Sequence, residues 1–441
     1  MNRESKKSFI KGTIWNSLGS TMYGVNSFIM LLVVSSNVDA TEVGYFGIAF
    51  TTAQLMYIVG LLGTNHYQQT DYHEKYSLGD YKKAKLFACI LMIIGSSAVI
   101  FFMNFTGVKI LYTYLLTVLM LVNAVADMYQ NVFFQKNRLD LSGGALFYRT
   151  LWSLVAFVLT ATVSKSIICA IIIQVVVNIA VTMYYVKRYV PIIASEFSNN
   201  GKSAAFKNQS TENQSIDRND GKDIKSEKKY WKLIIECLPL FVSLFLMNVL
   251  LNASKYGIEF LMDDETQGYY NMVFIPLQVI NLFSQFIFKP LFNKYSRIIE
   301  ERKYSLLYKL IVSQVLGVAV FAILCAIVAN ICGISILGML YGKDVSAYKQ
   351  TLLYVIYGGG IFAITQLFYY VMVILREQIK IMIIYVIGTT VASISAVFLI
   401  IKDGINGAAL SLIVTISVVL VLYIVTFVSV VENRRRYEKD N

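Results

Sequence analysis

The chain has 441 residues, of which 56% are hydrophobic and only 15% are charged. A water-soluble protein of this length needs far more polar surface, so the composition excludes a soluble enzyme or binding module. The net charge of +12 would suit nucleic acid, but it is spread over the short segments between apolar stretches, as membrane insertion requires. We therefore expect an integral membrane protein whose anionic partner is the lipid bilayer and not nucleic acid.

Twelve apolar stretches are each long enough to cross a bilayer as a helix. The first six lie at about 12–34, 43–63, 85–103, 110–134, 145–163 and 166–190. The other six lie at about 233–256, 267–292, 306–332, 349–374, 380–400 and 406–431. The first stretch follows a basic segment, but it is too long for a signal peptide and lacks a small-residue cleavage site. We expect it to remain in the protein as a signal anchor.

Lysine and arginine alternate between rich and poor segments along the chain. With the N-terminus in the cytoplasm, 33 of the 39 Lys and Arg lie inside and six lie outside. The six outside are Lys109, Lys165, Lys255, Lys343, Lys349 and Lys402. No other assignment of the connecting segments to the two sides gives a comparable excess of Lys and Arg on one side. The positive-inside rule therefore predicts that both termini are cytoplasmic.

The composition changes abruptly between residues 195 and 230, where Asn, Ser, Lys, Asp and Gln replace apolar residues. This segment is predicted to be a disordered cytoplasmic linker. It separates an N-terminal six-helix bundle, 1–194, from a C-terminal one, 231–433, and a basic tail follows at 434–441. The sequence thus predicts an all-α membrane protein built from two halves.

The two halves carry an internal echo at an offset of 224 residues. Five of the sixteen positions in 39–54 recur in 263–278. The recurring residues are Asp39, Gly44, Tyr45, Phe50 and Gln54, and Asp263, Gly268, Tyr269, Phe274 and Gln278. Because each half holds an even number of spans, the repeat should be parallel, with a pseudo-twofold axis along the membrane normal. Such pairs usually enclose a central path.

Polar residues recur on one face of two spans in the second half. The seventh span carries Asn248, Asn252, Lys255 and Glu259, and the eighth carries Asn271, Gln278, Asn281 and Gln285. Lys255 and Glu259 are four residues apart and can pair with each other. Pro276 is expected to bend the eighth span. Since such groups are costly in hydrocarbon, they should face a bundle interior or a wet cavity.

The first half has its own polar residues inside predicted spans, namely Gln54, Asn123, Asp127, Gln130, Gln135, Gln174 and Asn178. Asp127 is the deepest carboxylate, near the midplane, and Arg149 is the nearest predicted cation on the same side. Any single amide is adequately explained as a hydrogen bond between helices. The stripes taken together favour a solvated cavity, although Lys255 alone could also extend to the outer interface.

Other features argue against metal or catalytic chemistry. All five cysteines fall inside predicted spans without metal-ligand spacing, which predicts neither a disulfide nor a zinc site. The acidic stretch 263–265 is interpreted as a solvated outer loop and not as a metal site. Exposed loops are too short to hold the catalytic domain of a membrane glycosyltransferase or polymerase, so we expect no enzyme activity.

Several segments resemble the Wzx-type oligosaccharide flippases of the multidrug, oligosaccharidyl-lipid and polysaccharide (MOP) exporter superfamily. In the second half they are Asn252–Glu259, Phe274–Pro276 and Phe286–Pro290. In the first half they are Trp15–Asn16, Gly44–Phe46, Tyr67–Asp71, Glu74–Ser77 and Gln135–Asp140 followed by Arg149. The resemblance runs from about residue 10 to 400. The chain departs from it at Ser35 and Asn65, where relatives often have Arg, and at Glu259, where they have Asp.

This resemblance implies a MATE-like fold, with twelve helices in two bundles around a central cavity. It implies carriage of undecaprenyl-diphosphate-linked oligosaccharides across a bacterial cytoplasmic (inner) membrane, for capsule, O-antigen or exopolysaccharide assembly. Movement would be by alternating access, as the bundles rock. No cofactor is expected beyond a proton or sodium gradient, and a polysaccharide polymerase and chain-length proteins are expected partners.

The resemblance and the stripes together suggest roles for particular residues. Lys255 and Arg149 are the candidate diphosphate contacts, and Asp127 is the candidate coupling carboxylate. The candidate sugar contacts are Asn252, Glu259, Asn271, Gln278 and Asn281. Three alternatives remain: a multidrug cation exporter, a lipid II flippase, and a membrane glycosyltransferase or polymerase. The cations Lys255 and Arg149 argue against a cationic substrate.

Overall fold

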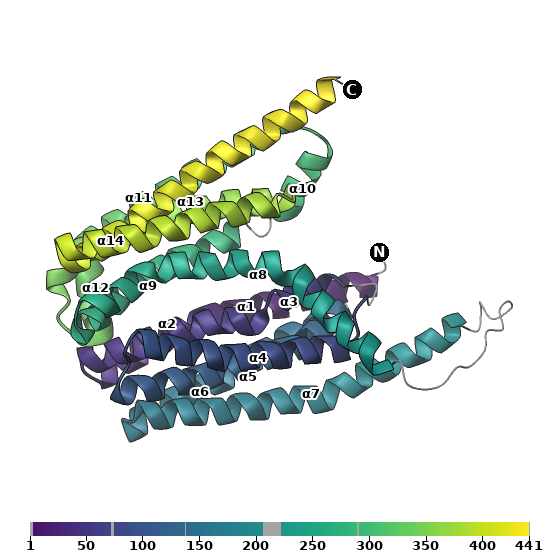
Figure 1. The fold of residues 1–441 in the computed structure, drawn as a ribbon, viewed down its shortest axis with the longest axis horizontal. Helices are drawn as coiled ribbons and strands as arrows, with labels where there is room; N and C mark the ends of the chain where they lie inside the picture. Colours follow the sequence, from purple (N-terminus) through teal and green to yellow (C-terminus); the bar gives the residue numbers. More distant parts are fainter. Residues whose placement is uncertain (1–2, 72–74, 137, 206–221, 289–290, 441) are drawn as a thin grey trace. The chain divides into compact units, whose positions relative to one another are not determined.

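The described part of the chain is almost entirely helical. A computed structural model describes residues 3–71, 75–136, 138–205, 222–288 and 291–440, and within these ranges it contains helices and no strand (Figure 1). The helices of the first half are α1 (Arg3–Asn37), α2 (Ala40–Leu61), α3 (Thr64–Thr70), α4 (Leu78–Phe102), α5 (Gly107–Gln135), α6 (Leu139–Ser164) and α7 (Ile167–Ala205). Those of the second half are α8 (Lys222–Leu261), α9 (Asp264–Phe288), α10 (Phe292–Glu300), α11 (Tyr304–Val328), α12 (Ile334–Tyr341), α13 (Lys349–Ile374) and α14 (Gln378–Asp440).

Each of the twelve predicted spans falls on a helix. A π-helical turn, Ala329–Gly333, joins α11 to α12 without a break, and together they cover the ninth predicted span. The last two spans both lie in α14, whose backbone leaves the helical region at Asp403 and Gly404. Among the described residues, ten helical segments are long and apolar enough to cross a membrane. The all-α membrane fold is therefore confirmed.

Helix extends into both edges of the segment expected to be a disordered linker. The helix α7 continues to Ala205, and α8 begins at Lys222. The centre of the expected linker, 206–221, lies outside the described residues. At the other end of the chain, α14 continues through the expected basic tail to Asp440.

The chain divides into two compact units that do not coincide with its two halves. The first unit comprises Met1–Met30, Thr52–Phe102 and Ile110–Phe241. The second comprises Leu31–Thr51, Met103–Lys109 and Val242–Asn441. The boundaries cut through α1, α2, α5 and α8, so each of these helices belongs partly to each unit. The second unit thus includes two pieces of the N-terminal half, Leu31–Thr51 and Met103–Lys109.

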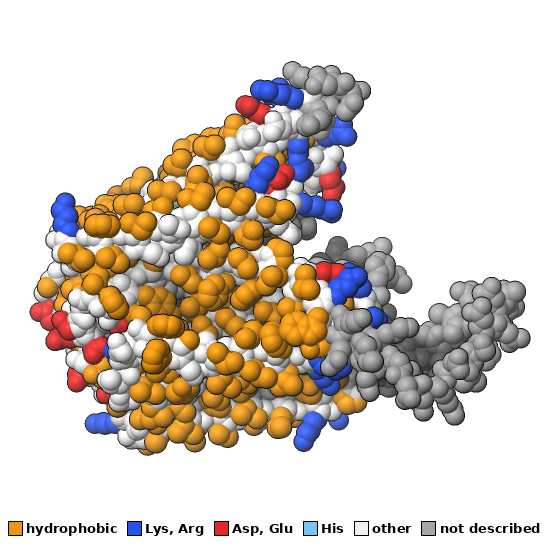
Figure 2. Space-filling model, in the orientation of Figure 1, with side chains coloured by type: hydrophobic (Ala, Val, Ile, Leu, Met, Phe, Trp, Pro, Cys, Tyr) orange, Lys and Arg blue, Asp and Glu red, His pale blue; other side chains and the backbone are white. Residues whose placement is uncertain are grey.

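Apolar side chains cover much of the outer surface of the helices. Phe101, Val163, Met339 and Phe398 are each at least 70% exposed. Figure 2 shows hydrophobic side chains along the visible flanks of the helices and charged ones mainly near helix ends. Because lipid tails can solvate apolar side chains, this distribution suits helices that cross a bilayer.

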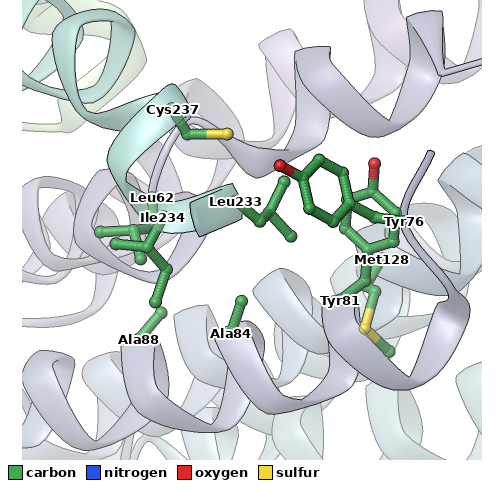
Figure 3. Close-up of a cluster of buried hydrophobic side chains, with 9 residues drawn as sticks. All are labelled: Leu62, Tyr76, Tyr81, Ala84, Ala88, Met128, Leu233, Ile234 and Cys237. Carbon is green, nitrogen blue, oxygen red and sulfur yellow. The ribbon is translucent and has the colours of Figure 1, made fainter. Parts of the chain in front are cut away.

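A cluster of buried hydrophobic residues ties the start of α8 to the first unit (Figure 3). Its members are Leu62, Tyr76, Tyr81, Ala84, Ala88, Met128, Leu233, Ile234 and Cys237. Beside it, Lys75 Nζ lies 2.8 Å from Glu236 Oε2, and the Tyr67 hydroxyl donates to the same oxygen at 2.6 Å. The hydrogen bond to Glu236 raises the pKa of Lys75 above its ordinary value. Residues before and after the linker are therefore held together within one unit.

Candidate functional site

The first unit has an ion pair in its interior. Arg149 Nη2 on α6 lies 2.8 Å from Asp127 Oδ1 on α5, and the two side chains are only 4% and 12% exposed. The Tyr57 hydroxyl donates to the other carboxylate oxygen, and Arg149 Nη1 lies 3.4 Å from the Asn123 carbonyl oxygen. The structure thus brings Asp127 together with the cation that the sequence places nearest to it.

Amide side chains extend this network across α5 and α7. Asn178 Nδ2 donates to Asn123 Oδ1 at 3.0 Å, and both residues are buried. Gln174, one helical turn before Asn178, is buried with its amide nitrogen 3.4 Å from the sulfur of Met30. Spacings of four residues place Asn123 and Asp127 on one face of α5, so local periodicity was sufficient to find them.

Two polar residues near this network were not predicted as site residues. Lys85 is only 3% exposed, and its amine donates to the Gly60 carbonyl oxygen at 2.8 Å. The predicted third span starts at residue 85, which places Lys85 at the edge of a cytoplasmic loop, whereas α4 begins at Leu78 and Lys85 lies inside that helix. Tyr57 is the other, and no sequence pattern marks a single tyrosine in a span as a carboxylate partner.

A small cavity lies beside Arg149. Its volume is about 20 Å³, and Gln130, Arg149, Thr182 and Tyr185 are among the residues that line it. Arg149 Nε and Thr182 Oγ1 are buried and have no hydrogen-bond partner among the described residues. A cavity of this volume is large enough to hold a water molecule.

Lys255 is the buried cation of the second unit. The residue is only 6% exposed, and its amine lies 4.3 Å from the centre of the Phe274 ring on α9. The next residue back, Ser254, accepts a hydrogen bond from Tyr270 at 2.9 Å, which fixes α8 against α9 at this level. Within the described part of the chain, no carboxylate lies at ion-pair distance from this amine.

The predicted pairing of Lys255 with Glu259 is wrong. Glu259 Oε1 instead lies 2.5 Å from Lys109 Nζ, which also lies 2.5 Å from Asp264 Oδ1. Helical spacing allows a pair at i and i+4 but does not compel it, and Lys109 comes from a segment 150 residues away. The acidic stretch 263–265 is therefore only partly a solvated loop, because Asp264 belongs to this ion-pair cluster.

The candidate sugar contacts differ in how far their amides are already satisfied. Asn252 Nδ2 donates to the Asn248 carbonyl oxygen at 3.0 Å, and Asn271 Nδ2 donates to the Gln267 carbonyl oxygen at 2.9 Å. Asn281 Oδ1 is buried with no partner among the described residues. Gln278 is half-buried on α9, the helix that contains Pro276. The side chain of Gln285 lies outside the described residues.

The two units hold different kinds of buried charged group. The first holds a guanidinium already paired with one carboxylate, close to a cavity of water size. The second holds a buried amine packed against an aromatic ring, with amide side chains on the same pair of helices. An unpaired buried ammonium is unfavourable, and an anion that reached it would gain a charge-assisted hydrogen bond.

Comparison with known proteins gives the fold. No protein-family model matches the sequence, and no curated protein matches it. An inward-facing multidrug-resistance MATE transporter of the MOP superfamily superposes with a TM-score of 0.63 at 11% identity, covering 94% of this chain and 96% of that one. The lipid II flippase MurJ in an inward closed conformation gives 0.65 at 14% identity, covering 93% and 87%.

A third solved structure agrees with these two. The Vibrio cholerae MATE transporter VcmN in its bent form gives a TM-score of 0.51 at 12% identity, covering 99% of this chain and 100% of that one. Identities this low establish the fold alone. The chain is a multi-pass membrane protein with the fold of the MATE and MurJ transporters.

Proposed function

We propose that the protein is a flippase for undecaprenyl-diphosphate-linked oligosaccharide repeat units. It would move them from the cytoplasmic to the outer leaflet of a bacterial cytoplasmic (inner) membrane by alternating access, for capsule, O-antigen or exopolysaccharide assembly. The fold supports a transporter, since solved structures that share it include MATE transporters and a lipid II flippase. The observation that carries the anionic substrate is the buried amine of Lys255.

A diphosphate is the chemistry that suits Lys255. An isolated ammonium inside a membrane protein is costly, and the Phe274 ring offsets only part of that cost. A diphosphate oxygen at the amine would form a strong hydrogen bond between opposite charges, which a neutral or cationic substrate cannot do. The polyprenyl tail of such a substrate can stay in lipid while its polar head enters the protein.

The amides near Lys255 are the proposed sugar contacts. Asn252 lies one turn before Lys255 on α8, and Asn271, Gln278 and Asn281 lie on the neighbouring α9. Amide groups can donate to and accept from sugar hydroxyls, so they suit a polar oligosaccharide better than an apolar drug. Glu259 is a weaker candidate than the sequence suggested, because one of its oxygens is bound to Lys109.

The Asp127–Arg149 pair provides a means of coupling. While Asp127 is ionised, it holds Arg149 at 2.8 Å. A proton or a sodium ion on Asp127 would weaken that pair and release the guanidinium for a diphosphate oxygen. Ion and substrate would then favour the same state of the pair, which is the requirement for thermodynamic coupling.

The alternative functions differ in how well they suit these side chains. A lipid II flippase is the second candidate, because lipid II carries the same undecaprenyl diphosphate and MurJ shares the fold. A multidrug exporter for cations suits Lys255 and Arg149 poorly, since both would repel the substrate. A membrane glycosyltransferase or polymerase is disfavoured by the transporter fold, so we propose a protein without enzyme activity, working beside a polymerase and chain-length proteins.

Deleting the gene in its host tests the proposal. Surface glycan and the undecaprenyl-diphosphate oligosaccharide on the cytoplasmic side would be quantified, with a plasmid copy as the control. Loss of surface polymer with accumulation of the lipid-linked repeat unit is the expected result. Accumulated lipid II would indicate the second candidate, and unchanged glycan with raised sensitivity to cationic drugs would refute the flippase.

Plasmid copies carrying Lys255→Ala and Arg149→Ala would test the anion contacts. Both are expected to lower glycan export at equal protein amounts. Lys402→Ala is the matched control, because Lys402 is an exposed lysine at the turn within α14, whereas Lys255 and Arg149 are buried. If both site variants export as well as the control, neither side chain binds the diphosphate.

A further inference from the structure

The helices α2 and α9 begin in the same way, 224 residues apart. Asp39 Oδ1 accepts a hydrogen bond from the backbone N–H of Glu42 at 2.8 Å, and Asp263 Oδ1 accepts one from Thr266 at 2.7 Å. Each aspartate side chain thus binds the backbone N–H three residues later, which is the contact that an N-cap residue makes with its helix. The internal echo in the sequence therefore has a structural counterpart at two helix starts.

The same two helices also cross each other symmetrically. A Cβ atom added to Gly44 would lie 2.0 Å from the Asp264 carbonyl oxygen, and one added to Gly268 would lie 2.0 Å from the Ala40 carbonyl oxygen. Gly44 and Gly268 are equivalent in the repeat, and so are Ala40 and Asp264. Contacts that exchange equivalent residues in this way are those of an isologous interface, so the pseudo-twofold axis passes between the two glycines.

Two lysines extend this symmetry to the neighbouring helix junctions. Lys109, in the first turn of α5, reaches across to Glu259 and Asp264 where α8 meets α9. In the other half, Lys343 follows α12 and donates to the Val38 carbonyl oxygen where α1 meets α2, at 2.5 Å. Each half therefore sends one lysine to the helix junction of the other half.

The two lysines are held by their partners with different strength. Lys109 is only 8% exposed, binds two carboxylates, and lies 5.2 Å and 5.3 Å from the ring centres of Tyr45 and Phe105. Among the described residues, Lys343 binds a single carbonyl oxygen. A buried ammonium held by two carboxylates is harder to separate from its partners than an ammonium held by one carbonyl oxygen. Lys109 therefore makes the stronger of the two contacts.

We infer that the crossing of Gly44 and Gly268, closed by Lys109 and Lys343, is a gate on the external face. The inference rests on the proposed alternating access, and the positive-inside rule places both lysines outside. All parts of the gate belong to the second unit, whereas α1 and α2 continue from it into the first unit. Opening the gate separates the starts of α2 and α9, and both lysines must then leave their partners.

Labelling of a single cysteine from outside the cell tests the gate. Thr51→Cys is the reporter, in a protein whose five native cysteines are replaced. Thr51 is 3% exposed and lies on α2 about 10 Å beyond Gly44. A membrane-impermeant maleimide added to intact cells should label it slowly in the otherwise unchanged protein, because the closed crossing lies between the reagent and the thiol.

Three variants are expected to open the gate. Gly44→Ala and Gly268→Ala force the backbones of α2 and α9 apart, and Lys109→Gln removes the stronger of the two lysine contacts. Each should raise the labelling rate by about tenfold, since crowding at the glycines and loss of the buried ion pairs of Lys109 each shift an equilibrium by about that factor. Gly317→Ala is the control, because a Cβ there meets nothing within 4 Å, and it should label at the parent rate.

The outcomes separate this inference from the proposed function. Labelling needs no glycan, so a gate that responds as expected stands even if the substrate is different. Parent-like labelling of Lys109→Gln refutes the gate, and this variant stays informative if the glycine variants fail to accumulate. A Gly317→Ala rate raised as much as the others refutes it too, because the effect would then be general loosening.

Discussion

Asp127→Asn is the substitution whose consequence follows most directly from the structure. It removes the charge of the carboxylate that pairs with Arg149 while keeping the size of the side chain. The guanidinium then stays ionised and buried, because arginine does not lose its proton in proteins. Asn123 still offers a carbonyl oxygen 3.4 Å away, but no carboxylate other than Asp127 pairs with Arg149 among the described residues.

The expected loss is large because both side chains are screened from solvent. Their exposures of 4% and 12% place the pair among buried ion pairs, for which removing one partner costs about 3–5 kcal/mol. In a unit of this size, such a loss lowers the melting temperature by roughly 6–20 °C. Asp127→Asn should therefore melt well below the parent protein.

The assay is thermal unfolding of the purified protein in detergent, with a matched pair of controls. Asp140→Asn removes the same type of partner from Arg138, but there the side chains are 41% and 24% exposed, so the cost should stay within about 1 kcal/mol. Adding Arg149→Gln to Asp127→Asn removes the unpaired charge and should recover most of the loss. The double-variant cycle then isolates the energy of the pair.

One result would refute this reasoning. If Asp127→Asn and Asp140→Asn lowered the melting temperature equally, Asp127 would not be neutralising a buried guanidinium. The conclusion would hold whatever the transport activity of the variant, since the readout is stability. The coupling role proposed for Asp127 would also lose its basis, because that role needs a pair strong enough to compete with substrate.

Further predictions concern topology, helix caps and pH. A reporter fused to the C-terminus should be active only in the cytoplasm, and activity on the external side would overturn the assignment of inside and outside. Asp39→Ala and Asp263→Ala should each cost about 0.5–2 kcal/mol and speed hydrogen exchange in the first turns of α2 and α9, and unchanged exchange would contradict the caps. Lys303 and Arg297 lower the pKa of Glu301 to about 2, so their stabilisation of α10 is present above its ordinary pKa of 4.5 and is lost as the pH falls through about 2. Hydrogen exchange in α10 should thus be faster in Glu301→Gln than in the parent protein at neutral pH, and this difference should fade as the pH falls from about 4.5 to about 2. A difference that persisted below about pH 2 would count against the ion pairs.

The membrane helices could be predicted because hydrocarbon imposes one simple rule. A stretch of about 20 apolar residues must form a helix to satisfy its backbone, so hydropathy alone finds it. The ends of the helices obey no such rule. The predicted third span starts at residue 85, whereas α4 begins at Leu78, because polar residues such as Asp80 and Lys82 can begin a helix as easily as a loop. The hydropathy pattern therefore places Lys85 at the edge of a loop, although it lies inside α4.

Contacts were predictable only where periodicity or depth restricts the choice. Asp127 and Arg149 were expected on the same side of the membrane, and the structure joins them. The pairing of Lys255 with Glu259 was wrong because a competing cation, Lys109, comes from a distant segment whose position no local pattern encodes. The sequence similarity around Gly44 and Gly268 predicts an internal repeat. It does not predict that the two glycines lie against each other, because that contact depends on how the two helices pack.

The buried cations differ in how completely they are paired, and this difference argues for different roles. Lys109 has two carboxylates, Arg149 has one, and Lys255 has none among the described residues. A fully paired cation stabilises the state in which its partners meet, which suits a gate. A cation with one carboxylate can exchange that partner for a substrate anion, which suits coupling. A cation with no carboxylate gains most when an anion arrives, which suits substrate binding. Variants of the three should accordingly differ in kind: Lys109→Gln should change accessibility, Arg149→Ala the dependence on the ion gradient, and Lys255→Ala the affinity for lipid diphosphate.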